Sequence, residues 1–365
     1  MTDPLNRSYF NPFKRVAVLG AGTMGAQIAA HFANAGLFVE LLDIPGSGAN
    51  RNEVVEKAFK RMTSLRPNPL FSSNSASRIR LGNFDDHIDR LGNVDWVVEA
   101  VVERLDIKAA LFEKVEAAVS ETAIISTNTS GIPIRLIAEG RSPSFQSRFL
   151  GTHFFNPPRY LRLLEIIPTK ETQKEVIEFL MHYGDLFLGK ETVLCKDSPA
   201  FIANRIGIYS ILSAMHTVEK MGLTVGEVDK LTGPIIGRAK SATFRTMDVV
   251  GLDTTVNVSN NLFAGLPHDE SKEGFKLPGI VKEMYDRKWW GDKTKQGYFK
   301  KTVSSEGKKE ILEIDLNTYE YGPSSKVQFD ALGAVKDIEN LKERIRILFN
   351  YDDRAGEFYR ATSYD

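Results

Sequence analysis

Residues 16–25, Val-Ala-Val-Leu-Gly-Ala-Gly-Thr-Met-Gly, decide the fold of this chain. They are a short apolar run that leads directly into G-x-G-x-x-G, and a helix-like segment, residues 26–35, follows. The next apolar run, residues 37–42, ends in Asp43, 18 residues after Gly25. This order of strand, tight turn, helix, second strand and acid is typical of a dinucleotide-binding βαβ unit. A glycine-rich turn in another kind of βα unit would explain the glycines alone, but not the whole series in register.

Each part of the motif has a physical role in this prediction. Gly20 permits the tight turn, Gly22 lets the backbone approach a pyrophosphate, and Gly25 allows the helix to pack closely on the strand. The helix that follows begins with Thr23 and Met24. Its unpaired N-terminal amides and the positive end of its dipole favour bound phosphates.

Asp43 predicts which dinucleotide binds. Its carboxylate can accept both ribose hydroxyls of the adenosine, whereas a 2′-phosphate would meet a negative charge there. No arginine follows in the next few residues to receive such a phosphate. The sequence therefore favours NAD over NADP.

Composition bounds what else the chain can do. Its 365 residues are enough for two domains, and 42% apolar and 26% charged residues are ordinary for a globular protein. A formal net charge of +0 gives no reason to expect nucleic acid or an anionic membrane as a partner. Cys195 is the one cysteine, so an internal disulfide and a multi-cysteine zinc site are excluded, no metal is expected, and an inert packed thiol is the simplest interpretation. The polar N-terminus and the absence of an apolar run of spanning length predict a cytoplasmic protein without membrane insertion.

Strand and helix patterns alternate through residues 1–197. Helical periodicity covers residues 52–65 and 106–119. Four further apolar runs predict strands, at residues 95–101, 123–126, 149–155 and 161–167. We therefore predict an α/β fold whose NAD-binding domain, residues 1–197, contains a doubly wound, mostly parallel Rossmann sheet.

The character of the sequence changes at residues 198–199, Ser-Pro. This pair predicts the start of a long helix that ends near Met221, with apolar residues around much of its circumference. Such a helix must be buried in a bundle or in a subunit interface. Residues 198–300 are predicted to be an all-α substrate and dimerisation domain. Residues 301–365 are predicted to begin as a linker or peripheral hairpin and to continue as the start of a possible second helical repeat.

A histidine and a glutamate in apolar strands form the candidate catalytic pair. His153 stands near the end of its strand, and ligands of open α/β sheets bind outside the carboxyl ends of the strands. An isolated histidine would be interpreted as a core residue, but Glu165 lies in an apolar strand where an unpaired carboxylate is costly. A carboxylate bonded to one ring nitrogen would leave the other nitrogen as a base. The alternative places Glu165 in solvent on an exposed edge strand.

Two polar residues elsewhere could bind a substrate oxygen. Asn204 lies near the start of the long helix, and Ser130 follows a strand end. The amide of Asn204 could instead make an ordinary capping or helix contact. Taken alone, Ser130 is typical of a polar loop.

Six motifs occur in a fixed order: GAGTMG, VVEAVVER, STNTS, HFFNP, LLEII and DSPAFIANR. Their combination, over about residues 14–300, resembles the L-3-hydroxyacyl-CoA dehydrogenases of fatty-acid β-oxidation. The resemblance implies NAD, an acyl-CoA substrate and oxidation of a (3S)-3-hydroxyacyl-CoA to the 3-ketoacyl-CoA. A 3-hydroxybutyryl-CoA dehydrogenase of short-chain metabolism is an alternative within the same family.

The resemblance also implies roles for individual residues. His153 would take the hydroxyl proton as hydride leaves for the nicotinamide, and Glu165 would orient the imidazole. Ser130 and Asn204 would position the substrate oxygen. Four further residues match positions near the cofactor: Glu103, Lys108, Asn128 and Asn156. The CoA phosphates could meet two lysines of the helix after Asp43, although a solvated helix face explains them equally well: Lys57 and Lys60.

Other functions fit less well. No tyrosine has a lysine four residues on, as short-chain dehydrogenases require, and one cysteine cannot supply the thiolates of a zinc-dependent alcohol dehydrogenase. The 3-hydroxyisobutyrate type needs a lysine where this chain has Ala200 and Phe201. A non-catalytic NAD-binding structural or sensor protein would have no physical reason to keep Glu165 in an apolar strand.

The length of the chain bears on its partners. Short members of the family end near a position like Lys301, whereas fused fatty-acid-oxidation proteins continue into a second helical repeat. We therefore expect the chain to be the N-terminal part of a larger multifunctional protein, which could carry an enoyl-CoA hydratase domain. Without the second repeat, we expect a homodimer.

Overall fold

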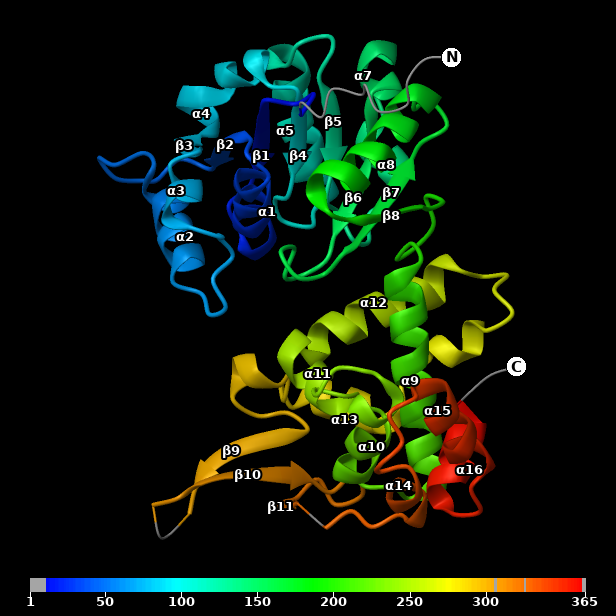
Figure 1. The fold of residues 1–365 in the computed structure, drawn as a ribbon. Helices are drawn as coiled ribbons and strands as arrows, with labels where there is room; N and C mark the ends of the chain where they lie inside the picture. The colour runs from blue at the N-terminus through cyan, green and yellow to red at the C-terminus, as the bar shows by residue number, and fades with distance from the viewer. Residues whose placement is uncertain (1–10, 305–306, 325, 363–365) are drawn as a thin grey trace. The chain divides into compact units, whose positions relative to one another are not determined.

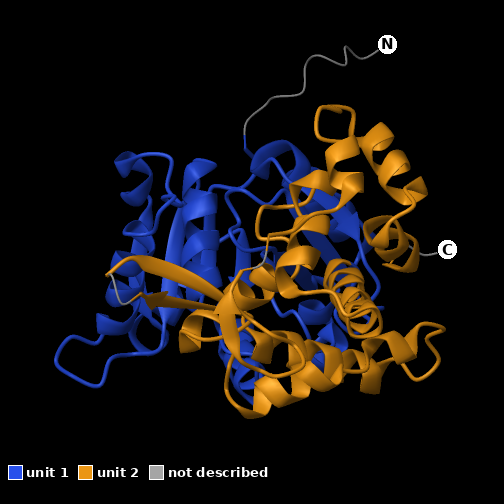
Figure 2. Ribbon diagram, turned by 90° about the horizontal axis from the view of Figure 1, so that it is seen from below, with its two compact units in different colours: residues 1–202 blue, residues 203–365 orange. Residues whose placement is uncertain are grey.

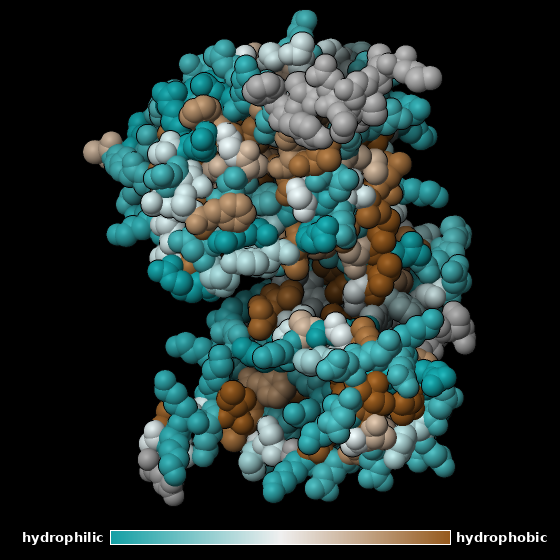
Figure 3. Space-filling model, viewed as in Figure 1, coloured by the Kyte–Doolittle hydropathy of each residue, from teal (hydrophilic) through white to brown (hydrophobic). Residues whose placement is uncertain are grey.

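A computed structural model describes residues 11–304, 307–324 and 326–362, and the chain forms two compact units, Met1–Ile202 and Ala203–Asp365 (Figure 2). The surface in Figure 3 is mostly hydrophilic, with smaller hydrophobic areas between the polar side chains. Within the described ranges, no helix combines the length and the apolar character needed to cross a membrane.

An eight-stranded sheet forms the centre of the first unit (Figure 1). Its strand order is β3-β2-β1-β4-β5-β6-β7-β8, and neighbouring strands are parallel except for β6 and β7. The strands are β1 (Arg15–Leu19), β2 (Phe38–Asp43), β3 (Ile79–Asn83), β4 (Trp96–Glu99), β5 (Ile124–Thr127), β6 (Phe149–Phe154), β7 (Leu163–Pro168) and β8 (Glu191–Leu194). The helices are α1 (Thr23–Asn34), α2 (Glu53–Thr63), α3 (Ser73–Ala76), α4 (Phe84–His87), α5 (Leu105–Ala118), α6 (Ile134–Ala138), α7 (Pro143–Ser147) and α8 (Lys174–Leu188). The predicted mostly parallel Rossmann sheet is confirmed.

Both faces of the sheet are buried at its central strands, β1, β4 and β5, which explains why these strands are largely apolar. Val16 and Val18 of β1 belong to the hydrophobic core on the side of α1 and α8. Ala17 and Leu19 belong to the core on the side of α5 and α6. Successive strand residues point to opposite faces, so a strand covered on both sides needs apolar residues at every position.

The second unit is mainly helical and begins with α9 (Ala203–Met221). This helix begins later than predicted, because Ala200 and Phe201 have left-handed φ angles of 58° and 52° that an α-helix cannot contain. The prediction that the helix opens at Ser198-Pro199 is therefore wrong. The other α-helices are α10 (Val225–Leu231), α11 (Phe244–Val250), α12 (Leu252–Gly265), α13 (Gly279–Asp286), α14 (Asp330–Ala334), α15 (Leu341–Asn350) and α16 (Arg354–Thr362).

Three strands between Phe299 and Pro323 form a small antiparallel sheet. Its strands, in the order β11-β10-β9, are β9 (Phe299–Val303), β10 (Lys309–Ile314) and β11 (Tyr321–Pro323). Farther along the chain, the hydroxyl of Tyr359 in α16 donates to the carbonyl of Leu231 at 2.7 Å. The described part of residues 301–365 thus belongs to the same compact unit as α9 and α10.

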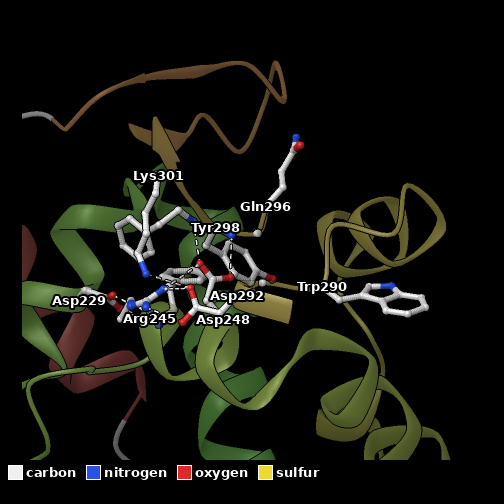
Figure 4. Close-up of polar contacts among 12 residues, drawn as sticks. Asp229, Arg245, Asp248, Trp290, Asp292, Gln296, Tyr298 and Lys301 are labelled. Atoms are coloured by element: carbon white, nitrogen blue, oxygen red, sulfur yellow. Dashed lines mark hydrogen bonds and ion pairs between the residues drawn. The ribbon is translucent and has the colours of Figure 1, made fainter. Parts of the chain in front are cut away.

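Asp248 of α11 joins the helices of the second unit to this small sheet (Figure 4). Its carboxylate accepts the backbone N–H groups of Tyr298 and Phe299 at 2.9 and 2.8 Å, and the residue is 2% exposed. A Cβ on Gly297 would lie 2.0 Å from Asp248 Oδ1. The glycine is therefore needed for the approach of the two segments.

Candidate active site

The turn between β1 and α1 has the geometry that its glycines predict. Gly20 has a φ of +97°, and a Cβ there would lie 2.7 Å from the carbonyl oxygen of Ala100. A Cβ on Gly25 would lie 1.8 Å from the oxygen of Gly20, so the helix packs against the turn at a distance that only glycine permits. A Cβ on Gly22, in contrast, would meet no atom within 4 Å. Open space therefore lies where a pyrophosphate would approach the N-terminus of α1.

A largely apolar cavity of about 590 Å³ lies beside this turn and has Asp43 in its wall. The carboxylate of Asp43 accepts the N–H of Ala21 at 2.7 Å, which fixes the acid at the end of β2. Its oxygens have lone pairs left for ribose hydroxyls. The remaining lining suits an adenine ring: Gly20, Gly22, Ile44, Phe84, Ala100, Val101, Val102, Ile107, Ala110, Leu111 and Lys114. These residues fit an adenine dinucleotide.

Two glutamates and a lysine support the loop after β5. Lys108 is 1% exposed, and its Nζ lies 2.8 Å from Oε1 of Glu99 and 3.4 Å from Oε2 of Glu103. The other carboxylate oxygen of Glu103 accepts the N–H groups of Ser130 and Gly131, both at 2.9 Å. Burial opposes ionisation of Glu103, but Lys108 and the hydrogen bonds outweigh it and lower the pKa of this carboxyl. Lys108 therefore contacts the loop of Ser130 through Glu103.

The structure brings His153 and Glu165 together as one cross-strand pair. They face each other in the antiparallel register of β6 and β7, with His153 Nδ1 2.7 Å from Glu165 Oε2. Glu165 is fully buried, and its Oε1 accepts the N–H of Ile202 at 3.1 Å. Since β8 pairs with β7 on its other side, the alternative of a solvated Glu165 on an edge strand is wrong. Cys195 also bonds to Glu165, and burial, together with that carboxylate, raises the pKa of its thiol to about 12.

Two further predicted residues, Asn128 and Asn156, lie at the same edge of the sheet. β1, β4, β5 and β6 are parallel, so their carboxyl ends share one edge. Asn128 follows β5, and its Oδ1 accepts the N–H of Phe154 at 2.9 Å. Asn156 follows β6, and its Oδ1 accepts from Nε2 of Gln27, in α1, at 3.1 Å. The loops of Ser130 and His153 and the dinucleotide helix are thus connected by hydrogen bonds.

Three predicted residues do not join this cluster. Asn204 is the second residue of α9 and belongs to the second unit, so its role stays a prediction. Lys57 and Lys60 lie exposed on α2, and Lys57 pairs with Glu53 one turn away. The geometry of these lysines is that of a solvated helix face as much as that of a phosphate site.

Two residues of the site were not predicted from the sequence. Gln27 links α1 to Asn156, and Lys190, only 2% exposed, donates to the carbonyls of Pro158 and Leu161. Gln27 and His31 are the two polar side chains in the buried stretch Gly25–Ala33 of α1, and a polar residue among apolar ones is a signal that could have found Gln27. Lys190 follows a helix-ending glycine, where a lysine is ordinarily solvated, so no local pattern marks it.

Comparison with known proteins agrees with this geometry. Residues 15–198 match the NAD binding domain of 3-hydroxyacyl-CoA dehydrogenases, and residues 201–301 match their C-terminal domain. A Bacillus subtilis protein named as a 3-hydroxyacyl-CoA dehydrogenase is 44% identical over 358 residues, which cover 94% of this chain and 45% of the relative. A Deinococcus radiodurans protein of the same name is 49% identical over 290 residues, 79% of this chain and 83% of the relative. The crystal structure of (S)-3-hydroxybutyryl-CoA dehydrogenase from Ralstonia eutropha has 27% sequence identity and a TM-score of 0.65, covering 78% of this chain and 98% of that one.

The chain belongs to the 3-hydroxyacyl-CoA dehydrogenase family, whose members are NAD-dependent oxidoreductases, and it contains the NAD-binding domain of that family. It spans about half the length of the Bacillus relative, of which it covers 45%. Further relatives have the names of fatty acid oxidation complex proteins.

Proposed function

We propose that the protein oxidises (3S)-3-hydroxyacyl-CoA thioesters of fatty-acid β-oxidation to 3-ketoacyl-CoA, with His153 as the general base. The observation that carries the proposal is the 2.7 Å contact between His153 Nδ1 and Glu165 Oε2. This pair lies at the same edge of the sheet as the dinucleotide turn that follows β1. A ring nitrogen held by a carboxylate leaves Nε2 to accept a proton.

The buried carboxylate has two effects on His153. It fixes the ring so that Nε2 is the basic nitrogen, and its negative charge stabilises the imidazolium formed when the substrate hydroxyl loses its proton. Bound NAD supplies the acceptor for the hydride that leaves C3. The loop of Ser130, held by Glu103, and Asn204 are proposed to bind the substrate oxygen. Lys57 and Lys60 are the proposed contacts of the CoA phosphates.

The test is reduction of 3-ketoacyl-CoA thioesters of increasing length, followed by consumption of NADH, in wild type and His153→Gln. We expect turnover by the wild type and a loss of about 100-fold or more in the variant, since general base catalysis contributes about that much. NADH binding should be retained in both. Binding without turnover on any chain length would contradict the proposal and favour a non-catalytic sensor. A strong preference for acetoacetyl-CoA would favour the short-chain alternative.

The proposed reaction also suggests which domains or chains accompany this one. We propose that the native protein is longer and carries an enoyl-CoA hydratase domain, or that this chain forms a homodimer in the cytosol. The intact mass of the native protein distinguishes the two, and a native mass of 40.8 kDa, that of this chain, would contradict the first. A monomer in sedimentation at micromolar concentration would contradict the second.

A further inference from the structure

The loop of residues 155–162 follows the strand of His153 and has an unusual support. Lys190 lies directly after Gly189, whose φ of 61° ends α8 and turns the chain. The side chain of Lys190 is buried, at 2% exposure, and its Nζ donates to the carbonyl of Leu161 at 2.8 Å and to that of Pro158. Two backbone positions of one loop are thus held by one ammonium group.

A buried lysine of this kind is costly. No carboxylate of the described residues forms an ion pair with Lys190, and the ring of Phe154 lies 5.8 Å from its Nζ. Burial lowers the pKa of Lys190 to about 8. A charged group without an ionic partner in such a place destabilises the fold, so carbonyl oxygens and an aromatic face alone must compensate its desolvation.

The same loop is connected to the cofactor helix at its other end. Asn156 accepts from Gln27 of α1 at 3.1 Å, and Gln27 also donates to the carbonyl of Thr23 at 2.9 Å, in the first turn of that helix. A continuous series of contacts therefore runs from Lys190 through the loop to the G-x-G-x-x-G turn. Arg159 supports the middle of the loop by donating to the carbonyl of Leu70 at 3.1 Å.

We propose that Lys190 is a positioning residue for the cofactor: its ammonium group fixes residues 156–161 so that Asn156 stays bonded to Gln27, whose amide also donates to the first turn of α1. The inference rests on the proposed NAD-dependent reaction, to which it adds a residue that touches neither substrate nor cofactor. The loop that Lys190 holds begins two residues after His153.

The test compares Lys190→Met with Lys174→Met in the full chain. Lys174 is the first residue of α8, the helix that precedes Lys190; its side chain is 82% exposed, and it serves as the control for loss of a lysine charge. For Lys190→Met we expect a rise of about tenfold in the dissociation constant of NADH, a change of about 1.4 kcal/mol. The KM for NAD should rise while kcat changes less, and the amides of residues 156–162 should exchange hydrogen faster. Lys174→Met should leave the NADH dissociation constant, the KM for NAD and the amide exchange of the loop unchanged.

A folded Lys190→Met protein with wild-type NADH affinity and wild-type exchange in the loop would overturn the inference. Should Lys190→Met fail to fold, Lys190→Gln, which keeps one donor, decides by the same two measurements. Because NADH binding and amide exchange need no substrate, they remain informative even if the wild type turns over no 3-ketoacyl-CoA. Failure of the positioning role and failure of the proposed reaction are therefore distinguishable.

Discussion

In the proposed reaction, Glu165 is the residue on which the general base depends most closely. Both of its carboxylate oxygens are bonded, and the residue is fully buried. Glu165→Gln keeps the shape but removes the charge that stabilises a protonated His153. We expect kcat for 3-ketoacyl-CoA reduction to fall about 100-fold or more, with little change in NADH affinity. Steady-state kinetics and NADH titration measure both quantities.

The control for this substitution is Glu191→Gln. Glu191 lies on the neighbouring strand β8, but its side chain is 63% exposed and pairs with Arg162. It should behave as wild type. If both variants kept kcat within a few-fold of wild type, Glu165 would not act on the base.

Two glycines of the dinucleotide turn separate binding from folding. Gly22→Ala should leave stability nearly unchanged, because the new Cβ meets no atom within 4 Å. It should weaken NADH binding, since the methyl group occupies the space of the pyrophosphate. Gly25→Ala places a Cβ 1.8 Å from the oxygen of Gly20 and should lower the free energy of unfolding by about 1–3 kcal/mol. Chemical denaturation and NADH titration of both variants check this, and equal stability of the two would contradict it.

The sequence predicts site residues where their chemistry conflicts with their surroundings. Glu165 is a carboxylate in an apolar strand, so its need for a partner can be inferred without a structure. Lys190 could not be found in this way, because a lysine after a helix-ending glycine is ordinarily exposed. Its burial depends on how the loop of residues 156–161 folds back, which no local pattern records.

At the scale of elements, α1 and α8 meet at a buried histidine. Nε2 of His31 contacts the carbonyl of Leu188 at 3.1 Å, while its Nδ1 has no hydrogen-bond partner among the described residues. Burial, reinforced by the charge of Lys190, lowers the pKa of His31 from 6.5 to about 3. The folded protein therefore keeps this histidine neutral at a pH at which the unfolded chain protonates it.

The sign of the resulting pH dependence follows from this difference. Because the folded-state pKa is lowered, the unfolded state binds the proton first, and the free energy of unfolding falls as the pH drops from 6.5 towards 3. The slope contributed by one such group is at most about 1.4 kcal/mol per pH unit. The free energy of unfolding can be obtained from denaturation curves at pH 7, 6 and 5. Its decrease with falling pH should be smaller for His31→Gln than for wild type. The exposed His182 on α8 is the control, and equal slopes for His31→Gln and His182→Gln would contradict the prediction.

The existence of a helix or strand is easier to predict from the sequence than the residue at which it begins. The apolar runs predict β1, β2 and β4 to β7, but not β3 or β8, which have exposed positions, and helical periodicity leaves α8 unpredicted. It does not predict that α9 begins only at Ala203, since the left-handed backbone of Ala200 and Phe201 is imposed by packing. Both residues are buried, at 5% and 3% exposure, so their contacts decide their conformation.

At the scale of the whole molecule, the two units should respond to different perturbations. NADH binds the first unit and should stabilise it by about 2.7 kcal/mol at a concentration 100 times its dissociation constant. Gly297→Ala should destabilise the second unit, since the new Cβ lies 2.0 Å from Oδ1 of Asp248. Hydrogen exchange resolved by segment measures both effects. Protection by NADH should be confined to residues 11–202 and loss of protection in the variant to later residues, and a uniform change across the chain would contradict independent units.

The pairing of β6 with β7 has a consequence for how this site tolerates change. His153 and Glu165 are opposite rungs of one antiparallel ladder, so the backbone hydrogen bonds of two strands set their separation. A change in the connection, residues 155–162, would therefore act on the contact between Asn156 and Gln27 rather than on the separation of His153 and Glu165, provided that the ladder stays in register. A slip of one residue would instead turn Glu165 to the other face of the sheet. The geometry of the proposed proton-transfer pair is thus set by the ladder, and that of the proposed cofactor contacts by the connection.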